Sequence, residues 1–161
     1  MRVHLLRHGI AEDHAASDAE RALTPEGRKK LKQVLQVAAA SGLEPSMIVS
    51  SPYKRAMQTA EIAAAEFKFK DKIVELGALV PDSTPRKAWD ELRAFRDQPE
   101  VIVVGHEPLF SQLAAFLLGT PELMIDFKKG GILSIEMTQV GNAPRAALRW
   151  YLTPKLAGTG D

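Results

Sequence analysis

Residues 2–9 read RVHLLRHG, and this stretch decides the fold that the sequence predicts. Its first part, residues 2–6, is short and mostly apolar, which is typical of a buried strand. The strand candidate ends abruptly in Arg7, His8 and Gly9. Ligands of open α/β sheets bind beyond the carboxyl ends of the strands, so a basic pair at this position predicts a functional site there.

Two later segments repeat the pattern of a short apolar run that ends in basic or imidazole side chains. They are residues 47–55 and residues 101–108. If the three strands are neighbours in one sheet, their ends bring four polar side chains into one pocket: Arg7, His8, Arg55 and His106. Two arginines and two histidines beside helix N-termini, which favour anions, predict a phosphate site.

The remaining pattern predicts the layers around these strands. Thr24 and Pro25 start a helix that Gly42 stops, and Ser51 with Pro52 repeats the cap-and-proline signal for a second helix through residue 67. The other expected elements are an edge strand at 73–76, helices at 85–96 and 108–118, and a hairpin of strands at 132–137 and 146–152. Strand–helix alternation followed by a hairpin predicts an α/β fold, a three-layer α/β/α sandwich with a mostly parallel mixed sheet, in a single domain of residues 1–161.

The composition excludes several classes of protein. The chain has 161 residues, with 21 Lys plus Arg, 20 Asp plus Glu and no cysteine. This near balance of charge does not indicate a nucleic-acid or membrane partner, and the lack of cysteine excludes disulfides and cysteine-based phosphatases. The N-terminus has no secretory signal and no stretch is long enough to cross a bilayer, so we expect a cytoplasmic protein. The oligomeric state is not indicated.

Three motifs in order resemble those of the histidine phosphatase (phosphoglycerate mutase-like) superfamily. The motifs are Arg7-His8-Gly9, residues 50–60 and Gly105-His106. Within the superfamily the resemblance is closest to the SixA-type phosphohistidine phosphatases. The interval between Arg55 and His106 leaves no room for the insertion of the larger mutases, and residues 21–27 and 149–154 are similar to segments of that branch. The resemblance implies a phosphoglycerate mutase-like fold.

The resemblance also implies roles for the residues of the pocket. His8 attacks phosphorus and carries the phosphoryl group, while Arg7 and Arg55 hold its oxygens. His106 holds another oxygen or moves a proton, and water then hydrolyses the phosphohistidine without a metal or cofactor. His8 must be neutral to attack, and cationic neighbours lower its pKa. Arg21, in the loop before the first helix, is a further candidate for substrate binding. An equal alternative is that its side chain is only solvated.

The general acid is the least defined part of this hypothesis. Related mutases take a glutamate from the segment between the second and third motifs, where Glu75 and Asp82 are the candidates here. Asp82 follows a proline and fits a solvated turn better than a general acid. For Glu75 both interpretations stay open: a general acid, or a solvated residue at the end of a strand. A phosphohistidine substrate would ease the need for an acid, because the leaving imidazole can carry a proton.

Three functions compete on this pattern. The leading one is a hydrolase that removes the phosphoryl group from phosphohistidine in a protein, such as a phosphorelay domain. The alternatives are a phosphatase of small phosphate esters or sugar phosphates, and a catalytically silent phosphate-binding module. The presence of all four pocket residues disfavours the silent module, and the lack of an Asp-x-Asp pair disfavours another class of phosphatases.

Overall fold

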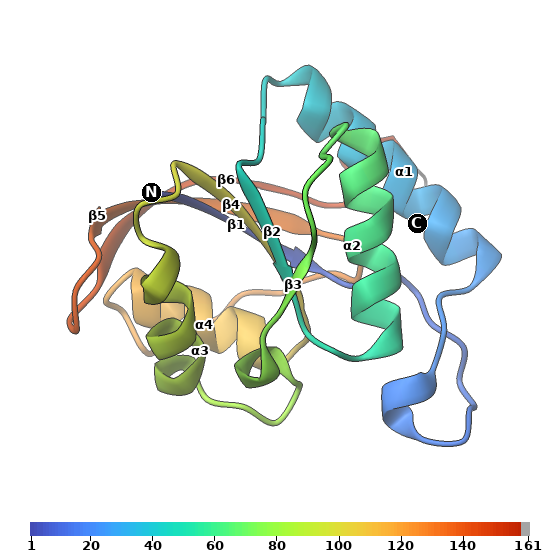
Figure 1. The fold of residues 1–161 in the computed structure, drawn as a ribbon, viewed down its shortest axis with the longest axis horizontal. Coiled ribbons are helices and arrows are strands. Elements are labelled where there is room, and N and C mark those ends of the chain that lie inside the picture. The colour runs from blue at the N-terminus through green and yellow to red at the C-terminus, as the bar shows by residue number, and fades with distance from the viewer. Residues whose placement is uncertain (159–161) are drawn as a thin grey trace.

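A computed structural model describes residues 1–158, and the end of the expected domain, residues 159–161, lies outside the described residues. Its centre is a six-stranded sheet in the order β3-β2-β4-β1-β5-β6 (Figure 1). The strands are β1 (Arg2–Arg7), β2 (Met47–Ser50), β3 (Val74–Glu75), β4 (Glu100–Gly105), β5 (Ile132–Gln139) and β6 (Arg145–Leu152). β1 to β4 pair in parallel, whereas β5 is antiparallel to β1 and β6 to β5. The predicted mixed, mostly parallel sheet is therefore confirmed.

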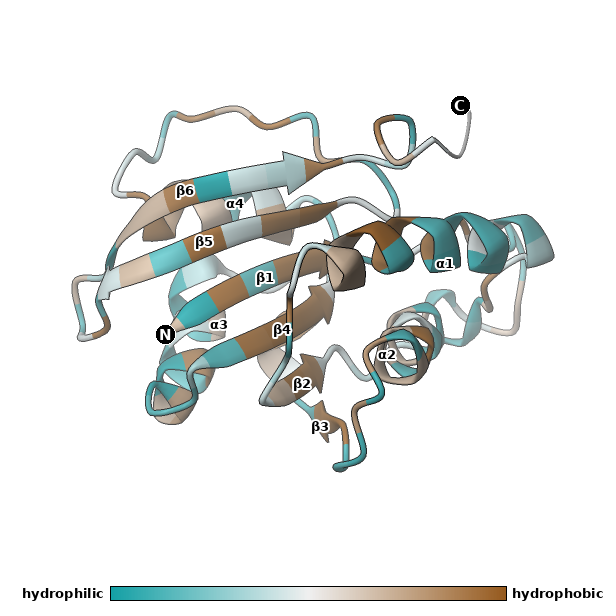
Figure 2. Cartoon of the chain, turned by 90° about the horizontal axis from the view of Figure 1, so that it is seen from above, coloured by the Kyte–Doolittle hydropathy of each residue, from teal (hydrophilic) through white to brown (hydrophobic). Residues whose placement is uncertain are grey.

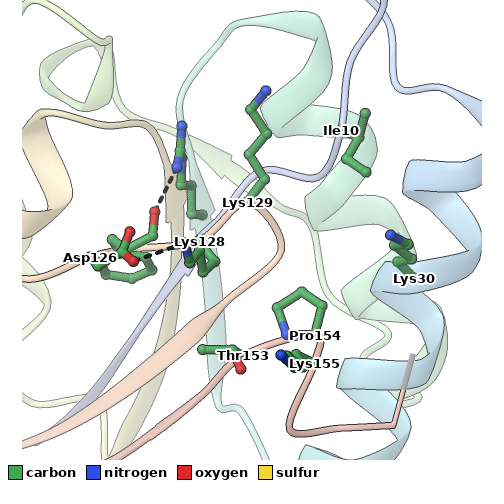
Figure 3. A pocket seen from close by; sticks show the side chains of 10 residues that line it. Ile10, Lys30, Asp126, Lys128, Lys129, Thr153, Pro154 and Lys155 are labelled. Carbon is green, nitrogen blue, oxygen red and sulfur yellow. Dashed lines mark hydrogen bonds and ion pairs between the residues drawn. The ribbon is translucent and has the colours of Figure 1, made fainter. Parts of the chain in front are cut away.

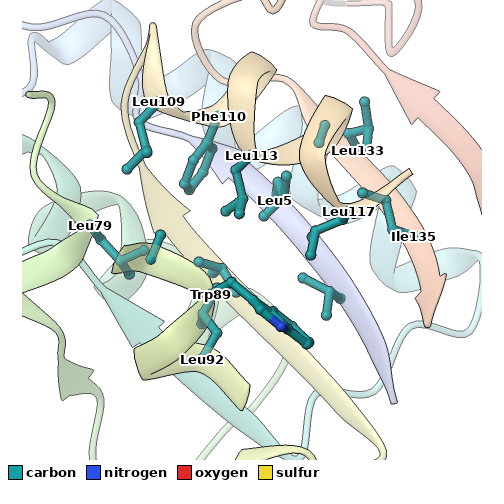
Figure 4. Close-up of a cluster of buried hydrophobic side chains, with 14 of the residues drawn as sticks. Leu5, Leu79, Trp89, Leu92, Leu109, Phe110, Leu113, Leu117, Leu133 and Ile135 are labelled. Carbon is teal, nitrogen blue, oxygen red and sulfur yellow. The ribbon is translucent and has the colours of Figure 1, made fainter. Parts of the chain in front are cut away.

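Helices cover both faces of the sheet, as Figure 1 shows. One face carries α1 (Pro25–Ala40) and α2 (Lys54–Glu66), and the other carries α3 (Pro85–Leu92) and α4 (Leu109–Leu117). Because successive strand residues point to opposite faces, Leu6 packs in the core under α1 and α2, while Leu5 packs with Trp89 and Phe110 under α3 and α4 (Figure 4). The apolar residues concentrate on the central strands (Figure 2), which accounts for the three-layer sandwich.

The first helix begins and ends where the sequence predicts. The Thr24 side chain accepts a hydrogen bond from the Gly27 N–H at 2.9 Å, and Pro25 occupies the first turn. The chain leaves the helix at Gly42, whose φ of 96° suits a residue without a Cβ. α1 therefore shows how local signals alone can place an element.

The start of the second helix corrects the prediction. α2 begins at Lys54, and its N-cap residue, Tyr53, makes no side-chain cap bond. Ser51 lies before the helix, where its hydroxyl accepts the Tyr53 N–H at 3.2 Å and contacts His106 at 2.8 Å. Ser51 and Pro52 are thus not the N-cap and first residue of α2. The Ser51 hydroxyl instead contacts His106, which follows β4. The helix predicted at 85–96 is also shorter, ending at Leu92 and continuing as a 3₁₀ turn over Arg93–Phe95.

The strand order settles whether the three motifs can meet. β2, β4 and β1 are consecutive neighbours and parallel, so their carboxyl ends lie at one edge of the sheet. Within residues 1–158, no helix has the length and apolar character that a membrane span requires.

Candidate active site

Backbone hydrogen bonds continue past the strand ends and draw the motifs together. The His8 N–H donates to the Gly105 carbonyl at 3.0 Å, and the Ser51 N–H donates to the Val104 carbonyl at 2.9 Å. The rings of His8 and His106 consequently lie with their centroids 5.1 Å apart. The structure therefore brings His8 and His106, from the first and third motifs, side by side.

The hydrogen bonds of His8 define its tautomer. Its Nδ1 lies 2.7 Å from the Gly9 carbonyl oxygen, which can only accept, so Nδ1 carries the proton. Nε2 is then left with its lone pair and accepts a long hydrogen bond from Arg55 Nε at 3.4 Å. Burial lowers the pKa of His8 to about 3, and the positive charges of Arg55 and Arg7 add to that shift. The sequence predicted the effect of the cations, but burial of this 6% exposed side chain is the larger cause.

His106 is also neutral and points one nitrogen at a hydroxyl. Its Nε2 lies 2.8 Å from Ser51 Oγ, which already accepts the Tyr53 N–H and can therefore donate its own hydrogen to Nε2. The proton of His106 then lies on Nδ1, which is buried and has no hydrogen-bond partner among residues 1–158. Burial lowers the pKa of His106 to about 3, followed by the effects of His8 and Arg55.

The two arginines are held by different parts of the chain. Arg7 donates from Nη1 to the Phe127 carbonyl at 2.6 Å, while its Nε is buried and has no partner within the described residues. Arg55, only 5% exposed, donates from Nη1 to the Asp18 carbonyl at 2.7 Å and from Nη2 to the Asp18 carboxylate at 3.2 Å. Buried guanidinium and imidazole donors without partners suit an anion such as a phosphoryl group.

Comparison with known proteins supports this interpretation. The sequence pattern described as the histidine phosphatase superfamily (branch 1) matches residues 3–79. A phosphohistidine phosphatase SixA homolog of Haemophilus influenzae is 31% identical over 130 residues, covering 74% of this chain and 78% of that protein. The chain belongs to the histidine phosphatase superfamily.

Two further relatives extend the likeness over nearly the whole length. The phosphohistidine phosphatase SixA of Escherichia coli K12 is 28% identical over 158 residues, covering 96% of this chain and 94% of that one. A structure of the protein histidine phosphatase SixA complexed with tungstate superimposes with a TM-score of 0.86 at 26% identity, covering 96% and 98% of the two chains. These findings confirm the predicted family, its SixA-type branch and the fold.

Thr59 and Gln58 of the second motif hold the backbone around the site through their side chains. Thr59 accepts the Gly9 N–H at 3.2 Å and donates to the Arg55 carbonyl at 2.7 Å, so it ties the first motif to α2. The Gln58 side chain accepts the Leu23 N–H at 2.8 Å. Gly9 itself has no room for a side chain, because a Cβ there would lie 2.6 Å from Leu31 Cδ1. The loop after β1 is therefore fixed on both sides.

Asp18 is a site residue that sequence reasoning missed. It lies in a 3₁₀ turn (Asp18–Glu20), and its carboxylate bridges Arg55 at 3.2 Å and Arg21 at 2.9 Å. Arg21 also donates from Nε to the Glu12 carbonyl at 2.6 Å. Arg21 and Arg55 are thus linked through the Asp18 carboxylate, which pairs with both guanidinium groups. The spacing of Asp18 three residues before Arg21 was the only local signal for this bridge.

The loop before β5 forms a further wall that the sequence did not predict. The Gly130 N–H is shared by the carbonyls of Arg7 and His8, at 3.2 and 3.0 Å, and the Arg7 N–H donates to the Gly131 carbonyl at 3.0 Å. Lys129 is consequently fixed beside the first motif, and its charge contributes to the lowered pKa of His8.

Neither candidate acid makes a hydrogen bond or ion pair with the four pocket residues within residues 1–158, although Glu75 pairs in register with Ser50. Glu75 is exposed on β3, at the edge of the sheet, with β2 and β4 between it and β1. It lines a cavity with Met57 and Lys72 that includes none of the four pocket residues. Asp82 lines another cavity beside Lys87. Within residues 1–158 there is also no group of three or more histidine, aspartate or glutamate side chains placed to hold a metal ion.

Proposed function

We propose that this phosphatase removes the phosphoryl group from phosphohistidine in a protein, carrying it on His8 before water releases it. The observation that carries the proposal is the state of His8: a buried neutral imidazole whose Nε2 lone pair faces Arg55, with the charge of Arg7 also acting on the ring. The likeness to SixA proteins named as phosphohistidine phosphatases supports the choice of substrate.

In the first step, the Nε2 lone pair of His8 attacks phosphorus as the P–N bond of the substrate breaks. Positive charge develops on the His8 ring, and the Nδ1–H bond to the Gly9 carbonyl stabilises it and fixes the ring. The phosphoryl oxygens receive hydrogen bonds from the unpaired donors of the pocket, Arg7 Nε and His106 Nδ1, and from Arg55. Phosphoryl transfer depends mainly on such positioning and charge stabilisation.

In the second step, water attacks the phosphorus of phosphorylated His8, the new P–N bond breaks, and His8 returns to its neutral form. Inorganic phosphate leaves with the oxygen and the protons of the water, and His8 keeps its Nδ1 proton throughout. The proposal assigns no proton to Glu75, because this residue is exposed at the sheet edge and the leaving imidazole of phosphohistidine can carry the proton itself. Neither step is assigned to a metal ion or cofactor.

The proposed substrate is a phosphorelay domain, and we propose that the two proteins meet in the cytoplasm. We further propose that residues 1–161 act as a single domain, which the continuous sheet from β3 to β6 supports. Arg21 is the proposed second support of the substrate site, through the Asp18 carboxylate that it shares with Arg55.

The test compares three substrates in the presence of EDTA: a phosphorylated histidine-containing phosphotransfer domain, a panel of sugar phosphates and p-nitrophenyl phosphate. We expect the wild type to prefer the phosphoprotein and His8→Ala to abolish hydrolysis of all three. A preference for sugar phosphates would replace the protein substrate with a small ester. A wild type that binds phosphate but hydrolyses nothing would make the chain a silent binding module.

A further inference from the structure

A cavity of about 560 Å³ lies beside the phosphate site and is not used by the proposed chemistry (Figure 3). Arg7 forms part of its wall, so the cavity borders the candidate active site at this residue. The other walls come from α1, the loop before β5 and the segment after β6. Four lysines line it: Lys30, Lys128, Lys129 and Lys155.

The charge of this cavity is only partly neutralised by the protein. Lys30 pairs with Glu26 at 3.2 Å, and Lys128 pairs with Asp126, the one acidic residue of the lining, at 2.8 Å. Lys129 and Lys155 have no carboxylate partner among residues 1–158. The cavity therefore presents two ammonium groups, in addition to Arg7, to an incoming ligand.

The backbone that displays these charges is held in place. The Tyr151 hydroxyl accepts the Lys128 N–H at 2.7 Å and donates to the Asp126 carbonyl at 3.0 Å. Arg7 holds the Phe127 carbonyl at 2.6 Å, and the shared Gly130 N–H anchors the other end of the loop. A fixed backbone lowers the entropy that binding must overcome at this surface.

We propose that this cavity binds acidic side chains of the phosphorylated protein, on the surface around its phosphohistidine. The inference rests on the proposed function and adds a determinant of substrate choice to it. Complementary charge is the reason for an acidic partner. A protein rather than a small molecule fits because the cationic groups are solvent-exposed: the Lys128 side chain is 58% exposed and its partner Asp126 82%. Sites for small molecules instead enclose most of the ligand and place their few polar groups inside.

The test reverses charges one at a time. Lys155→Glu and Lys129→Glu are compared with Lys32→Glu, which lies on the exposed side of α1 outside the cavity. For the phosphorylated phosphotransfer domain, we expect kcat/KM to fall about tenfold in each cavity variant and to stay unchanged in the control. For p-nitrophenyl phosphate the fall should be much smaller in Lys155→Glu, and high salt should narrow the difference between wild type and variants on the phosphoprotein. Lys129→Glu is compared on the phosphoprotein alone, because the Lys129 charge also acts on His8.

A reciprocal change in the substrate sharpens the result. Replacing Asp and Glu residues near the phosphohistidine by Asn and Gln should lower kcat/KM with the wild type and leave it nearly unchanged with Lys155→Glu. Cavity variants with wild-type kcat/KM on the phosphoprotein would overturn the inference while the proposed function stands. A fall in Lys155→Glu that is equal for the phosphoprotein and p-nitrophenyl phosphate, or confined to the panel of sugar phosphates, would also overturn it. A wild type without activity on any phosphoprotein would instead overturn the proposed function itself, and the inference with it.

Discussion

Two histidine sites lie on the same pair of parallel strands, one near their start and one at their carboxyl ends. His4, on β1, is 1% exposed, and its Nε2 lies 2.8 Å from the Glu100 carboxylate at the start of β4. His8 and His106 follow the other ends of β1 and β4 and are also buried, but their nearest polar partners are an arginine and a hydroxyl group. Burial lowers the pKa at both sites, whereas Glu100 opposes that shift at His4.

Hydrogen-bond partners, rather than burial, distinguish the reactive histidine His8 from the structural histidine His4. At His4, the hydrogen bond to Glu100 uses Nε2 and links two strands, which suits a structural role. At His8, the Nδ1 bond to a carbonyl leaves Nε2 with a lone pair, and the neighbouring guanidinium groups favour an incoming anion.

The largest expected effect separates the two sites by activity. His8→Asn should lower kcat about 1,000-fold or more, because it removes the nucleophile. His4→Gln, which keeps a polar group for Glu100, should stay within a factor of about three of the wild type. Steady-state hydrolysis of the phosphoprotein measures both. An equal loss in the His4 variant, at unchanged stability, would remove the distinction between the sites.

Arg55→Lys should have the next largest effect. Lysine keeps the charge but cannot hold Asp18 with two nitrogens while a third faces His8, so we expect kcat/KM to fall about 100-fold. Arg28→Lys, at a half-buried arginine of α1 outside the four pocket residues, is the matched control and should leave kcat/KM unchanged. Near wild-type kinetics of Arg55→Lys would show that the pocket needs only a positive charge.

Much of this geometry could be predicted from local sequence, and the exceptions have a common cause. The positions of Arg7, His8 and His106 at strand ends were predictable. Each follows a short apolar run, and a strand prediction ends where that run ends. Asp18 was not, since its contact with Arg55 joins residues 37 positions apart and no pattern within its own turn requires it.

The corrected elements show the same limit. Ser51 and Pro52 have the local signature of a helix start, but the hydrogen bond between Ser51 and His106 depends on the neighbouring strand β4. Likewise, Glu75 was a reasonable candidate acid by its position between two motifs. The sequence predicted an edge strand there, but only the strand order shows that β2 and β4 lie between β3 and β1.

His4→Leu sharpens the comparison from the side of stability. Glu100 loses its partner beside a buried apolar residue, so the free energy of unfolding should fall by about 2 kcal/mol. Urea denaturation measures the loss, and the double variant His4→Leu/Glu100→Leu should recover part of it, because neither polar group then remains. An unchanged unfolding free energy in His4→Leu would show that the pair does not support the fold.

The smallest expected effect is the pH dependence of stability. In the folded chain the pKa values of His8 and His106 are about 3, below the ordinary histidine value of 6.5, so the unfolded chain binds more protons as pH falls through 6.5. Stability from these two groups is present above pH 6.5 and decreases below it, by about 1.4 kcal/mol between pH 7 and pH 6. Urea denaturation at both pH values should show a smaller decrease in a His8→Asn/His106→Asn variant. An equal decrease would assign the effect to other groups.

The phosphorylated enzyme tests the central claim most directly. The protein is mixed with phosphorylated phosphotransfer domain, quenched in alkali within the first turnover, digested with trypsin and sequenced by mass spectrometry. His8 and His14 fall in one tryptic segment, residues 8–21, so fragment ions must separate them, with His14→Asn as the control. We predict a phosphoryl group on His8 in the wild type and in His14→Asn, and none in His8→Asn. A phosphoryl group on another histidine, or turnover without any phosphorylated enzyme, would contradict the account.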